Sequence, residues 1–369
     1  MIESGSEQKV FWGDGDLPAH LASALSELGA KRVFVVCGRN SFSASGVADV
    51  VKAGLAGREW ERFSDFSSNP KIEDLNAGLK KLRAFRADVV LAAGGGSILD
   101  MGKLLAFFSA LSRSPEEYLD APDALSPDGE PLPTIAVPTT AGTGSEATHF
   151  AVLYRNGEKR SVADSSMLPA YVLLNPEFTR SLSPYQTACT GFDALAQGIE
   201  SLWAKGATDE SAGYAKKAVR LALESLESAV KNGDRASREK MMEAAYWAGR
   251  AINISKTTVC HALSYYMTSR YGYPHGHAVA LFLPAVFAEH ERRGAVPEAL
   301  NRLFPADAPP ASTLRELVNR LGLVPDRTFS SSETKTIAGK TNPQRLRNNP
   351  VDLPAPSLEG MVENALSGA

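Results

Sequence analysis

The chain has 369 residues, of which 44% are hydrophobic and 22% charged, and its 39 basic and 42 acidic residues leave a net charge of −3. This length exceeds one ordinary hydrophobic core and fits two domains with a cleft between them. The composition excludes a disordered or collagen-like chain. Because no block of Lys and Arg is interleaved with aromatic residues, we expect no nucleic-acid partner.

The remaining bulk features favour a cytoplasmic protein. Apolar stretches are too broken by polar residues to span a bilayer, so we expect no membrane association. The first ten residues, MIESGSEQKV, lack the basic and apolar segments of a secretory signal. Cys37, Cys189 and Cys260 are odd in number and form no CxxC pair, which predicts reduced core cysteines rather than disulfides or a cysteine-based zinc site.

The first half of the chain alternates short apolar runs with helical patterns, which is typical of a parallel sheet with crossover helices. Residues 32–37 (RVFVVC), 88–93 (DVVLAA) and 133–137 (PTIAV) are predicted strands. Each is followed by a small or polar loop: GRNS, GGGS and PTTAGTGSE. Since ligands bind at the carboxyl ends of such strands, residues 1–178 are predicted to form an α/β dinucleotide-binding domain with its site at these loops.

From about residue 180, strand-like runs largely disappear. Segments 185–204, 208–231, 236–253 and 257–269 carry apolar residues at helical spacing. Asn175-Pro176 and Ser183-Pro184 mark the boundary, because a residue before proline avoids the helical region. Residues 179–369 are therefore predicted to form an all-α domain, with 323–353 as a long ordered loop or short helices near the cleft.

Two of the loops resemble sites for phosphate and ribose. Glycines ahead of a helix let the backbone approach an anion, and the first N–H groups of the helix can bind a pyrophosphate. A plain strand-to-helix turn is the alternative for GGGS, since neither GxGxxG nor a P-loop is present. The second loop adds hydroxyl and backbone donors, and together the loops favour a nucleotide. The residues concerned are Gly95, Gly96, Ser97, Thr139, Thr140 and Thr143.

The loop after the first clear strand bears on the choice of nucleotide. Gly38, Arg39 and Ser41 stand where many dinucleotide enzymes place an acid on the adenosine ribose. A Gly with Arg and Ser beside it suits the 2′-phosphate of NADP(H), although an exposed arginine is usually only a solvated charge. NADP(H) is therefore favoured, with NAD(H) left open.

The helical half contains a group of metal-type side chains. Asp193 and Gln197 are four residues apart and project from one helix face, while His261 and His275 follow in later segments. Two histidines and a carboxylate are the usual ingredients of a catalytic zinc or ferrous site. Taken singly, each is more often a satisfied structural residue, and His277 can replace His275 as ligand.

Four segments carry a family resemblance: GGGSILDMGK (94–103), PTTAGTGSE (138–146), FDALAQGIES (192–201) and HALSYYMTSRYGYPHGHAVAL (261–281). Their order and spacing are similar to those of the iron-containing alcohol dehydrogenases over about the whole chain. The resemblance implies an N-terminal NAD(P) domain, a helical C-terminal domain of the dehydroquinate synthase-like architecture, and a divalent metal, Fe(II) or Zn(II). It further implies that Asp100 and Lys159 join the cofactor residues, and that Asp193, His261 and His275 bind metal.

Two positions depart from the family pattern. Gln197 stands where most members have a histidine, and Tyr265 stands where many have another. A neutral amide oxygen is a poorer ligand for iron or zinc than imidazole. The substitution therefore predicts weaker metal binding, a different metal or none.

Within the family, the phrases around Gln197 and His275 resemble the branch that contains phosphonoacetaldehyde reductases, enzymes of phosphonate biosynthesis. This predicts hydride transfer from NAD(P)H to a small aldehyde, with phosphonoacetaldehyde giving 2-hydroxyethylphosphonate as the leading substrate and product. His277 and Tyr265 are candidate proton relays. Cations for an anionic substrate are available at Lys256, Arg270, Arg345 and Arg347, which surface positions also explain. We expect a homodimer.

Three alternatives remain at this stage. One is a dehydrogenase of another small alcohol or hydroxy acid. Another is a metal-dependent lyase or cyclase of the dehydroquinate synthase type, against which stands the absence of any basic residue in 185–203. The third is a binding protein that has lost its metal through the change at Gln197.

Overall fold

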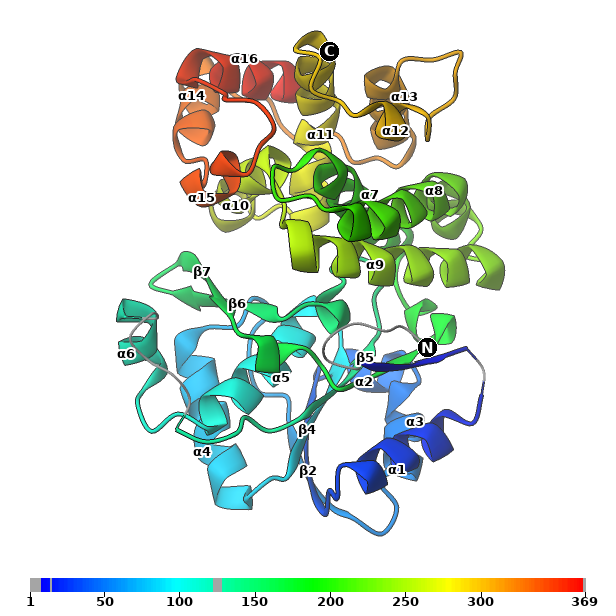
Figure 1. The fold of residues 1–369 in the computed structure, drawn as a ribbon, viewed down its shortest axis with the longest axis vertical. Helices are drawn as coiled ribbons and strands as arrows, with labels where there is room; N and C mark the ends of the chain where they lie inside the picture. The colour runs from blue at the N-terminus through cyan, green and yellow to red at the C-terminus, as the bar shows by residue number, and fades with distance from the viewer. Residues whose placement is uncertain (1–7, 14, 122–127, 368–369) are drawn as a thin grey trace. The chain divides into compact units, whose positions relative to one another are not determined.

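The computed structural model describes residues 8–13, 15–121 and 128–367. The chain divides into two compact units (Figure 1): the first comprises Met1–Thr140 and Ser145–Ser181, and the second comprises Ala141–Gly144 and Leu182–Ala369. The boundary at residues 178 and 179 expected from the sequence stays a prediction. The short stretch Ala141–Gly144 groups with the second unit although it lies between two strands of the first.

The first unit is built on a parallel six-stranded sheet of order β1-β8-β5-β4-β2-β3. Its central strands are continuous apolar runs, as expected for strands covered on both faces. The strands are β1 (Lys9–Trp12), β2 (Arg32–Cys37), β3 (Glu59–Phe63), β4 (Val89–Gly94), β5 (Thr134–Pro138) and β8 (Tyr171–Leu174).

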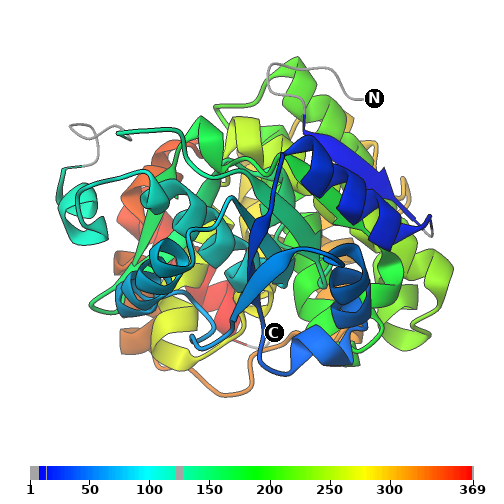
Figure 2. The same ribbon diagram turned by 90° about the horizontal axis from the view of Figure 1, so that it is seen from below.

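Helices cover both faces of this sheet (Figures 1 and 2). On one face, α1 and α3 pack on alternate side chains of β2 such as Val33 and Val35. On the other, α4 and α5 pack together, and Gly102 of α5 lies so close to β4 that a Cβ there would meet the Cβ of Ala92 at 2.6 Å. The helices are α1 (Leu17–Glu27), α2 (Ser41–Ala44), α3 (Val47–Gly54), α4 (Ile72–Phe85), α5 (Gly96–Ser109) and α6 (Pro115–Asp120).

A separate hairpin follows β5. It pairs β6 (Phe150–Arg155) with β7 (Glu158–Ala163) in antiparallel fashion. Its two turn residues, Asn156 and Gly157, have φ of 53° and 77°, the left-handed pair that a tight hairpin turn requires. Short 3₁₀ turns η2 (Ser145–Ala147), η3 (Ser165–Met167) and η4 (Pro176–Thr179) complete the unit.

The second unit is helical throughout its described residues, as the sequence predicted. Its central helix, α7, is buried on nearly every face and packs on α8, α9 and α11. The ten helices found there are α7 (Pro184–Trp203), α8 (Asp209–Lys231), α9 (Arg235–Ser255), α10 (Val259–Tyr271), α11 (His275–Arg292), α12 (Glu298–Asn301), α13 (Pro310–Arg320), α14 (Ser331–Gly339), α15 (Pro343–Arg347) and α16 (Ala355–Leu366).

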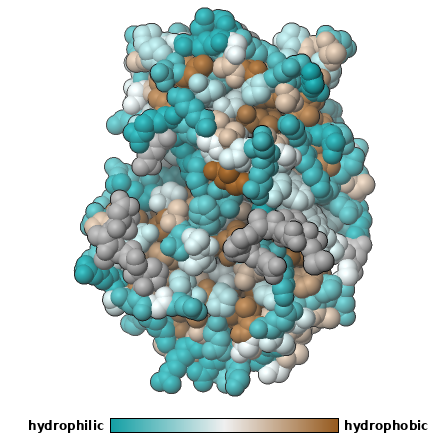
Figure 3. Space-filling view, viewed as in Figure 1, coloured by the Kyte–Doolittle hydropathy of each residue, from teal (hydrophilic) through white to brown (hydrophobic). Residues whose placement is uncertain are grey.

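Apolar side chains are concentrated in the core. On the face drawn in Figure 3, hydrophilic side chains predominate and the brown apolar patches are small. Cys37, Cys189 and Cys260 are buried and unpaired, as expected. Among the described residues, no helix is long and apolar enough to cross a membrane.

A buried lysine holds the loop after β5. Lys103 has no exposed surface, and its ammonium donates to the carbonyl oxygens of Ser145 (2.8 Å) and Phe150 (2.6 Å) and to the hydroxyl of Thr148 (3.0 Å). Asp100 lies 3.5 Å away and supplies a counter-charge. Burial lowers the pKa of Lys103, against the effect of the Asp100 carboxylate. The interior position is therefore tolerated only because several acceptors surround the ammonium.

Lys103→Met should lower the free energy of unfolding by about 2–4 kcal/mol, because it leaves buried carbonyl oxygens without a donor. Denaturant unfolding measures the change. Lys80→Met, at an exposed position of α4, is the control and should cost less than about 0.5 kcal/mol. Equal stability of the two variants would contradict a tethering role for Lys103.

Candidate active site

One face of α7 carries three buried polar side chains. Asp193, Gln197 and Glu200 stand at i, i+4 and i+7, so the helix places them in one row. Their exposed fractions are 3%, 3% and 0%. Polar groups buried so completely need partners, and those partners define the site.

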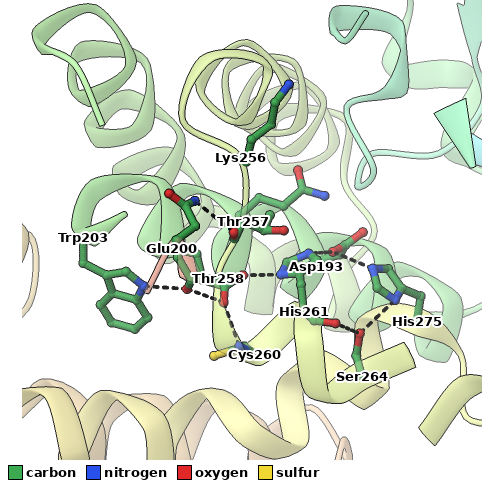
Figure 4. A network of polar contacts seen from close by, with 12 residues as sticks. Asp193, Glu200, Trp203, Lys256, Thr257, Thr258, Cys260, His261, Ser264 and His275 are labelled. Carbon is green, nitrogen blue, oxygen red and sulfur yellow. Dashed lines mark hydrogen bonds and ion pairs between the residues drawn. The ribbon is translucent and has the colours of Figure 1, made fainter. Parts of the chain in front are cut away.

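Glu200 ties the row to the start of α10 (Figure 4). Its Oε1 accepts hydrogen bonds from the Thr258 hydroxyl (2.7 Å) and the Cys260 backbone N–H (2.8 Å), and its Oε2 bonds Nδ1 of His261. Burial opposes ionisation of this carboxyl, yet the charge of His261 and these hydrogen bonds lower its pKa. Glu200 is therefore an ionised carboxylate without contact to solvent.

The bond from Glu200 fixes the orientation of the His261 ring. With Nδ1 facing the carboxylate, Nε2 points to Asp193, whose Oδ1 lies 3.2 Å away. Burial alone would lower the pKa of His261, but the charges and hydrogen bonds of Glu200 and Asp193 raise it to about 10. A carboxylate behind an imidazole is the arrangement that orients metal-binding histidines.

His275 reaches the same point from α11. The next residue, Gly276, lies against α7 so closely that a Cβ would come within 1.8 Å of the Cys189 carbonyl oxygen, so only glycine fits. Ser264 donates its hydroxyl proton to the His261 carbonyl oxygen (2.8 Å) and lies 3.3 Å from Nδ1 of His275. With that proton committed, the Ser264 oxygen is placed to accept from Nδ1–H, and the other ring nitrogen, Nε2, lies 3.9 Å from Oδ1 of Asp193.

These side chains form a group suited to a divalent cation. One ligand atom each from Asp193, His261 and His275 lies within 4.8 Å of the others. Gln197 turns its amide nitrogen to the Thr143 carbonyl oxygen (3.3 Å), and its buried Oε1 has no hydrogen-bond partner. A buried amide oxygen is left unsatisfied at a cost unless something binds it, so the donor set fits a metal ion. The structure thus brings together three of the residues predicted as metal ligands, and the fourth, Gln197, stands one helical turn after Asp193 on the same face of α7.

The two proton relays predicted from the sequence differ in their surroundings. The ring of Tyr265 stacks on that of His275, with centroids 6.3 Å apart. His277 is buried, and its ring nitrogens bond the Tyr185 hydroxyl (2.8 Å) and the Val324 carbonyl oxygen (3.0 Å). Because burial lowers the pKa of His277, it is a neutral imidazole with both nitrogens engaged inside the protein.

In the first unit, the predicted phosphate loops meet at one sheet edge. β4 and β5 are neighbours, and the Thr139 N–H donates to the Gly94 carbonyl oxygen (3.0 Å). Helix α5 starts at Gly96 with Gly95 as its N-cap, and no side chain caps its first N–H groups. A Cβ on Gly95 would lie 3.2 Å from Thr140, which keeps the loop compact. Ser97 accepts a hydrogen bond from the Asn69 N–H (3.2 Å).

Other predicted cofactor residues are engaged within the protein. Asp100 accepts from the Ser145 hydroxyl and from the Val152 N–H (2.9 Å). Lys159 is half-buried on β7. Arg39 is exposed and pairs with Asp65. In the same loop, Gly38 lies against the side chain of Ser41. Ser41 itself stands in the first turn of α2.

The four predicted substrate cations divide into two groups. Lys256 and Arg345 are half-buried, and burial together with the charge of Arg345 lowers the pKa of Lys256. Arg270 and Arg347 are exposed. An electrostatic interaction is therefore indicated between the first two.

Sequence reasoning missed Glu200 and Ser264, the two residues that orient the histidines. Both carried a periodic signal. Glu200 is seven residues after Asp193, and Ser264 is three residues after His261, so each shares a helix face with a predicted ligand.

Comparison with known proteins identifies families and solved structures that are similar to this chain. A family model for the iron-containing alcohol dehydrogenases matches residues 7–176, and one for the C-terminal part of that family matches residues 187–324. The solved iron-containing alcohol dehydrogenase from Thermotoga maritima has a TM-score of 0.87 and 29% identity over 99% of both chains. Sulfoacetaldehyde reductase from Bifidobacterium kashiwanohense, solved in complex with NAD⁺, has a TM-score of 0.87 and 27% identity over 100% of both chains.

Two curated proteins with similar sequences are also an aldehyde reductase and an alcohol dehydrogenase. Phosphonoacetaldehyde reductase from Streptomyces viridochromogenes is 37% identical over 64% of this chain and 65% of its own length. Long-chain-alcohol dehydrogenase 1 from Geobacillus thermodenitrificans is 33% identical over 75% of this chain and 70% of its own length. The alignments thus span about two thirds of these relatives.

This chain belongs to the iron-containing alcohol dehydrogenase family. The predicted family and fold are confirmed. At the level of the family, so are the class of enzyme, an NAD(P)-dependent alcohol dehydrogenase or aldehyde reductase, and the cofactors, NAD(P) with a divalent metal.

Glu200→Gln should weaken metal binding by about 10- to 100-fold, because it removes the charge that orients and polarises His261. Competition with a chromogenic chelator measures the dissociation constant for Zn(II). The matched control is Glu210→Gln, at an exposed position of the neighbouring helix. If Glu200→Gln folds normally and binds Zn(II) as tightly as the control, Glu200 does not support the metal.

Proposed function

We propose that this protein reduces a small aldehyde to a primary alcohol by hydride transfer from NAD(P)H. The observation that carries the proposal is the group of Asp193, His261 and His275, whose ligand atoms lie within 4.8 Å of one another and whose histidines are oriented by Glu200 and Ser264. Gln197, one helical turn after Asp193, adds a buried amide oxygen without a hydrogen-bond partner. When bound, a divalent metal acts as a Lewis acid on the carbonyl, and the nicotinamide supplies the hydride.

The cofactor role falls to the loops at the sheet edge. The open N–H groups at the start of α5, with Gly95, Gly96 and Ser97, bind the pyrophosphate. Thr139 and Thr140 add donors beside it, while Asp100 and Lys103 hold the second loop in place. Thr143 stays a proposed cofactor contact. Lys159 stays a proposed cofactor contact.

The nucleotide preference rests on the loop after β2. Gly38, Arg39 and Ser41 present no carboxylate to a ribose, and Arg39 is exposed. To bind the 2′-phosphate of NADPH, Arg39 must break its ion pair with Asp65. That ion pair is exposed to solvent and therefore contributes little to stability. We therefore propose NADPH over NADH.

A proton must reach the alcohol oxygen as it forms, and we propose that the Tyr265 hydroxyl donates it. Tyr265 stacks beside His275, whereas His277 is bonded on both ring nitrogens. His277 then serves to hold α11 against Tyr185 and residue 324.

The proposed substrate is phosphonoacetaldehyde, with 2-hydroxyethylphosphonate as the product. Support comes from two relatives whose names specify short aldehydes with an anionic group, a phosphonate in one and a sulfonate in the other. A dehydrogenase of another alcohol or hydroxy acid is the alternative within the family. Homodimer formation and a cytoplasmic location stay predictions from the sequence.

NADPH consumption with phosphonoacetaldehyde, propanal and sulfoacetaldehyde tests the proposal directly. We expect aldehyde-dependent oxidation in the presence of Fe(II) or Zn(II), loss of activity with a chelator, and recovery on adding metal back. NADH is the parallel arm. Redox-neutral conversion of a phosphorylated sugar acid, without any nucleotide oxidation, would instead support a lyase or cyclase.

Gln197→His should tighten binding of Zn(II) by about tenfold, or about 1.4 kcal/mol, because imidazole is a better ligand than an amide oxygen. Gln197→Ala should weaken it, since the unsatisfied Oε1 is removed. Isothermal titration of the metal-stripped variants gives both dissociation constants. Identical affinities for all three side chains would show that residue 197 does not contact the metal.

A further inference from the structure

Lys256 adopts a backbone conformation that suits glycine. At the C-terminal end of α9 it has φ of 63° and ψ of 176°. Arg86, another non-glycine residue with positive φ, has ψ of 52° and so lies in the ordinary left-handed helical region. The Lys256 conformation is instead almost restricted to glycine, so a lysine there is strained.

The surrounding chain holds Lys256 in this conformation. Asn348 donates from one amide nitrogen to the carbonyl oxygens of Ser255 (2.8 Å) and Thr257 (3.1 Å), on either side of Lys256. The other end of the same amide accepts the Gly206 N–H (3.0 Å). A side chain from a segment more than ninety positions away thus fixes the loop.

The same loop is joined to the metal-binding group. Two residues after Lys256, the Thr258 hydroxyl donates to Glu200, whose other oxygen bonds His261. Figure 4 shows Lys256 rising from the loop ahead of α10, above Thr257, with His261 and Asp193 below. The position of Lys256 is therefore set relative to the ligands by a short chain of buried contacts.

The strained residue also takes part in a pair of like charges. Lys256 is half-buried, and burial together with the charge of Arg345 lowers its pKa to about 8. Arg345 lies in α15, whose segment docks on α10. Like charges that interact in a partly dehydrated place raise each other's energy, and an anion that contacts both relieves it.

We propose that Lys256, with Arg345, binds the tetrahedral oxyanion of the substrate, so that the substrate class is a short aldehyde bearing a phosphonate or sulfonate. This inference rests on the proposed aldehyde reduction and adds the residue that selects the anionic group. A glycine at position 256 would relieve the strain, but it would also remove the ammonium that binds the anion. The strained lysine is therefore retained. Functional sites are where such strain is retained.

Selectivity between charged and neutral aldehydes tests the role of the ammonium. The quantity to measure is kcat/KM for phosphonoacetaldehyde, and separately for sulfoacetaldehyde, divided by kcat/KM for propanal. In Lys256→Ala and Lys256→Gly this ratio should fall by about 10- to 100-fold, as expected for loss of a charge-assisted contact. The control Lys335→Ala removes an exposed lysine of α14 and should leave the ratio as in the wild type.

Thermal unfolding of the two variants tests whether the backbone at position 256 is strained. Both variants lose the ammonium, but only glycine relaxes the backbone, so Lys256→Gly should have a higher Tm than Lys256→Ala. If Lys256 served only to stabilise the fold, neither variant would change the ratio of kcat/KM values for anionic and neutral aldehydes. Equal Tm values for the two variants would overturn the claim of strain.

Direct binding keeps the inference testable if no aldehyde is reduced. Titration of the metal-loaded protein with ethylphosphonate and with ethanesulfonate, which cannot be reduced, should show at least about tenfold weaker binding of one or both in the two variants. Unaltered binding of both anions together with an unaltered selectivity ratio would overturn the proposal. Failure of the wild type to oxidise NADPH or NADH with any aldehyde would instead count against the proposed function alone.

Discussion

A carboxylate with no exposed surface organises the helical unit. Glu200 must be compensated for its loss of water, and it is compensated by a hydroxyl, a backbone N–H and an imidazole from the start of α10. The same bonds that stabilise its charge dictate which nitrogen of His261 faces Asp193. The requirement to satisfy one buried charge therefore produces the geometry of the metal-binding group.

Much of this arrangement could be predicted from the sequence, and the limits have physical reasons. The continuous apolar runs of β2, β4 and β5 signalled buried parallel strands, and the helices from α7 to α10 showed clear periodicity. The edge strand β3, Glu59–Phe63, was missed because three of its five residues are charged and one of its two aromatic residues, Trp60, is exposed. Strands β1 and β8 have only four residues each, and β7 of the hairpin is mostly polar and exposed, so none of these stood out.

The candidate ligands were predicted from motifs, but their supports were not. Motif reasoning singles out side chains that bind a metal, whereas Glu200 and Ser264 act one bond further away. His277, one of the two residues predicted as proton relays, forms hydrogen bonds within the fold through both ring nitrogens. The strain at Lys256 had no sequence signal at all, because it depends on Asn348, which lies far along the chain.

Gln197 alters how the site responds to acid. Histidine must lose a proton before it binds a metal, whereas an amide oxygen carries none at any ordinary pH. A site built from one carboxylate, two imidazoles and one amide exchanges fewer protons for its metal than a site with three imidazoles. Metal retention in this protein should therefore depend less steeply on pH, so that the difference in affinity from a three-histidine site narrows in mildly acidic surroundings.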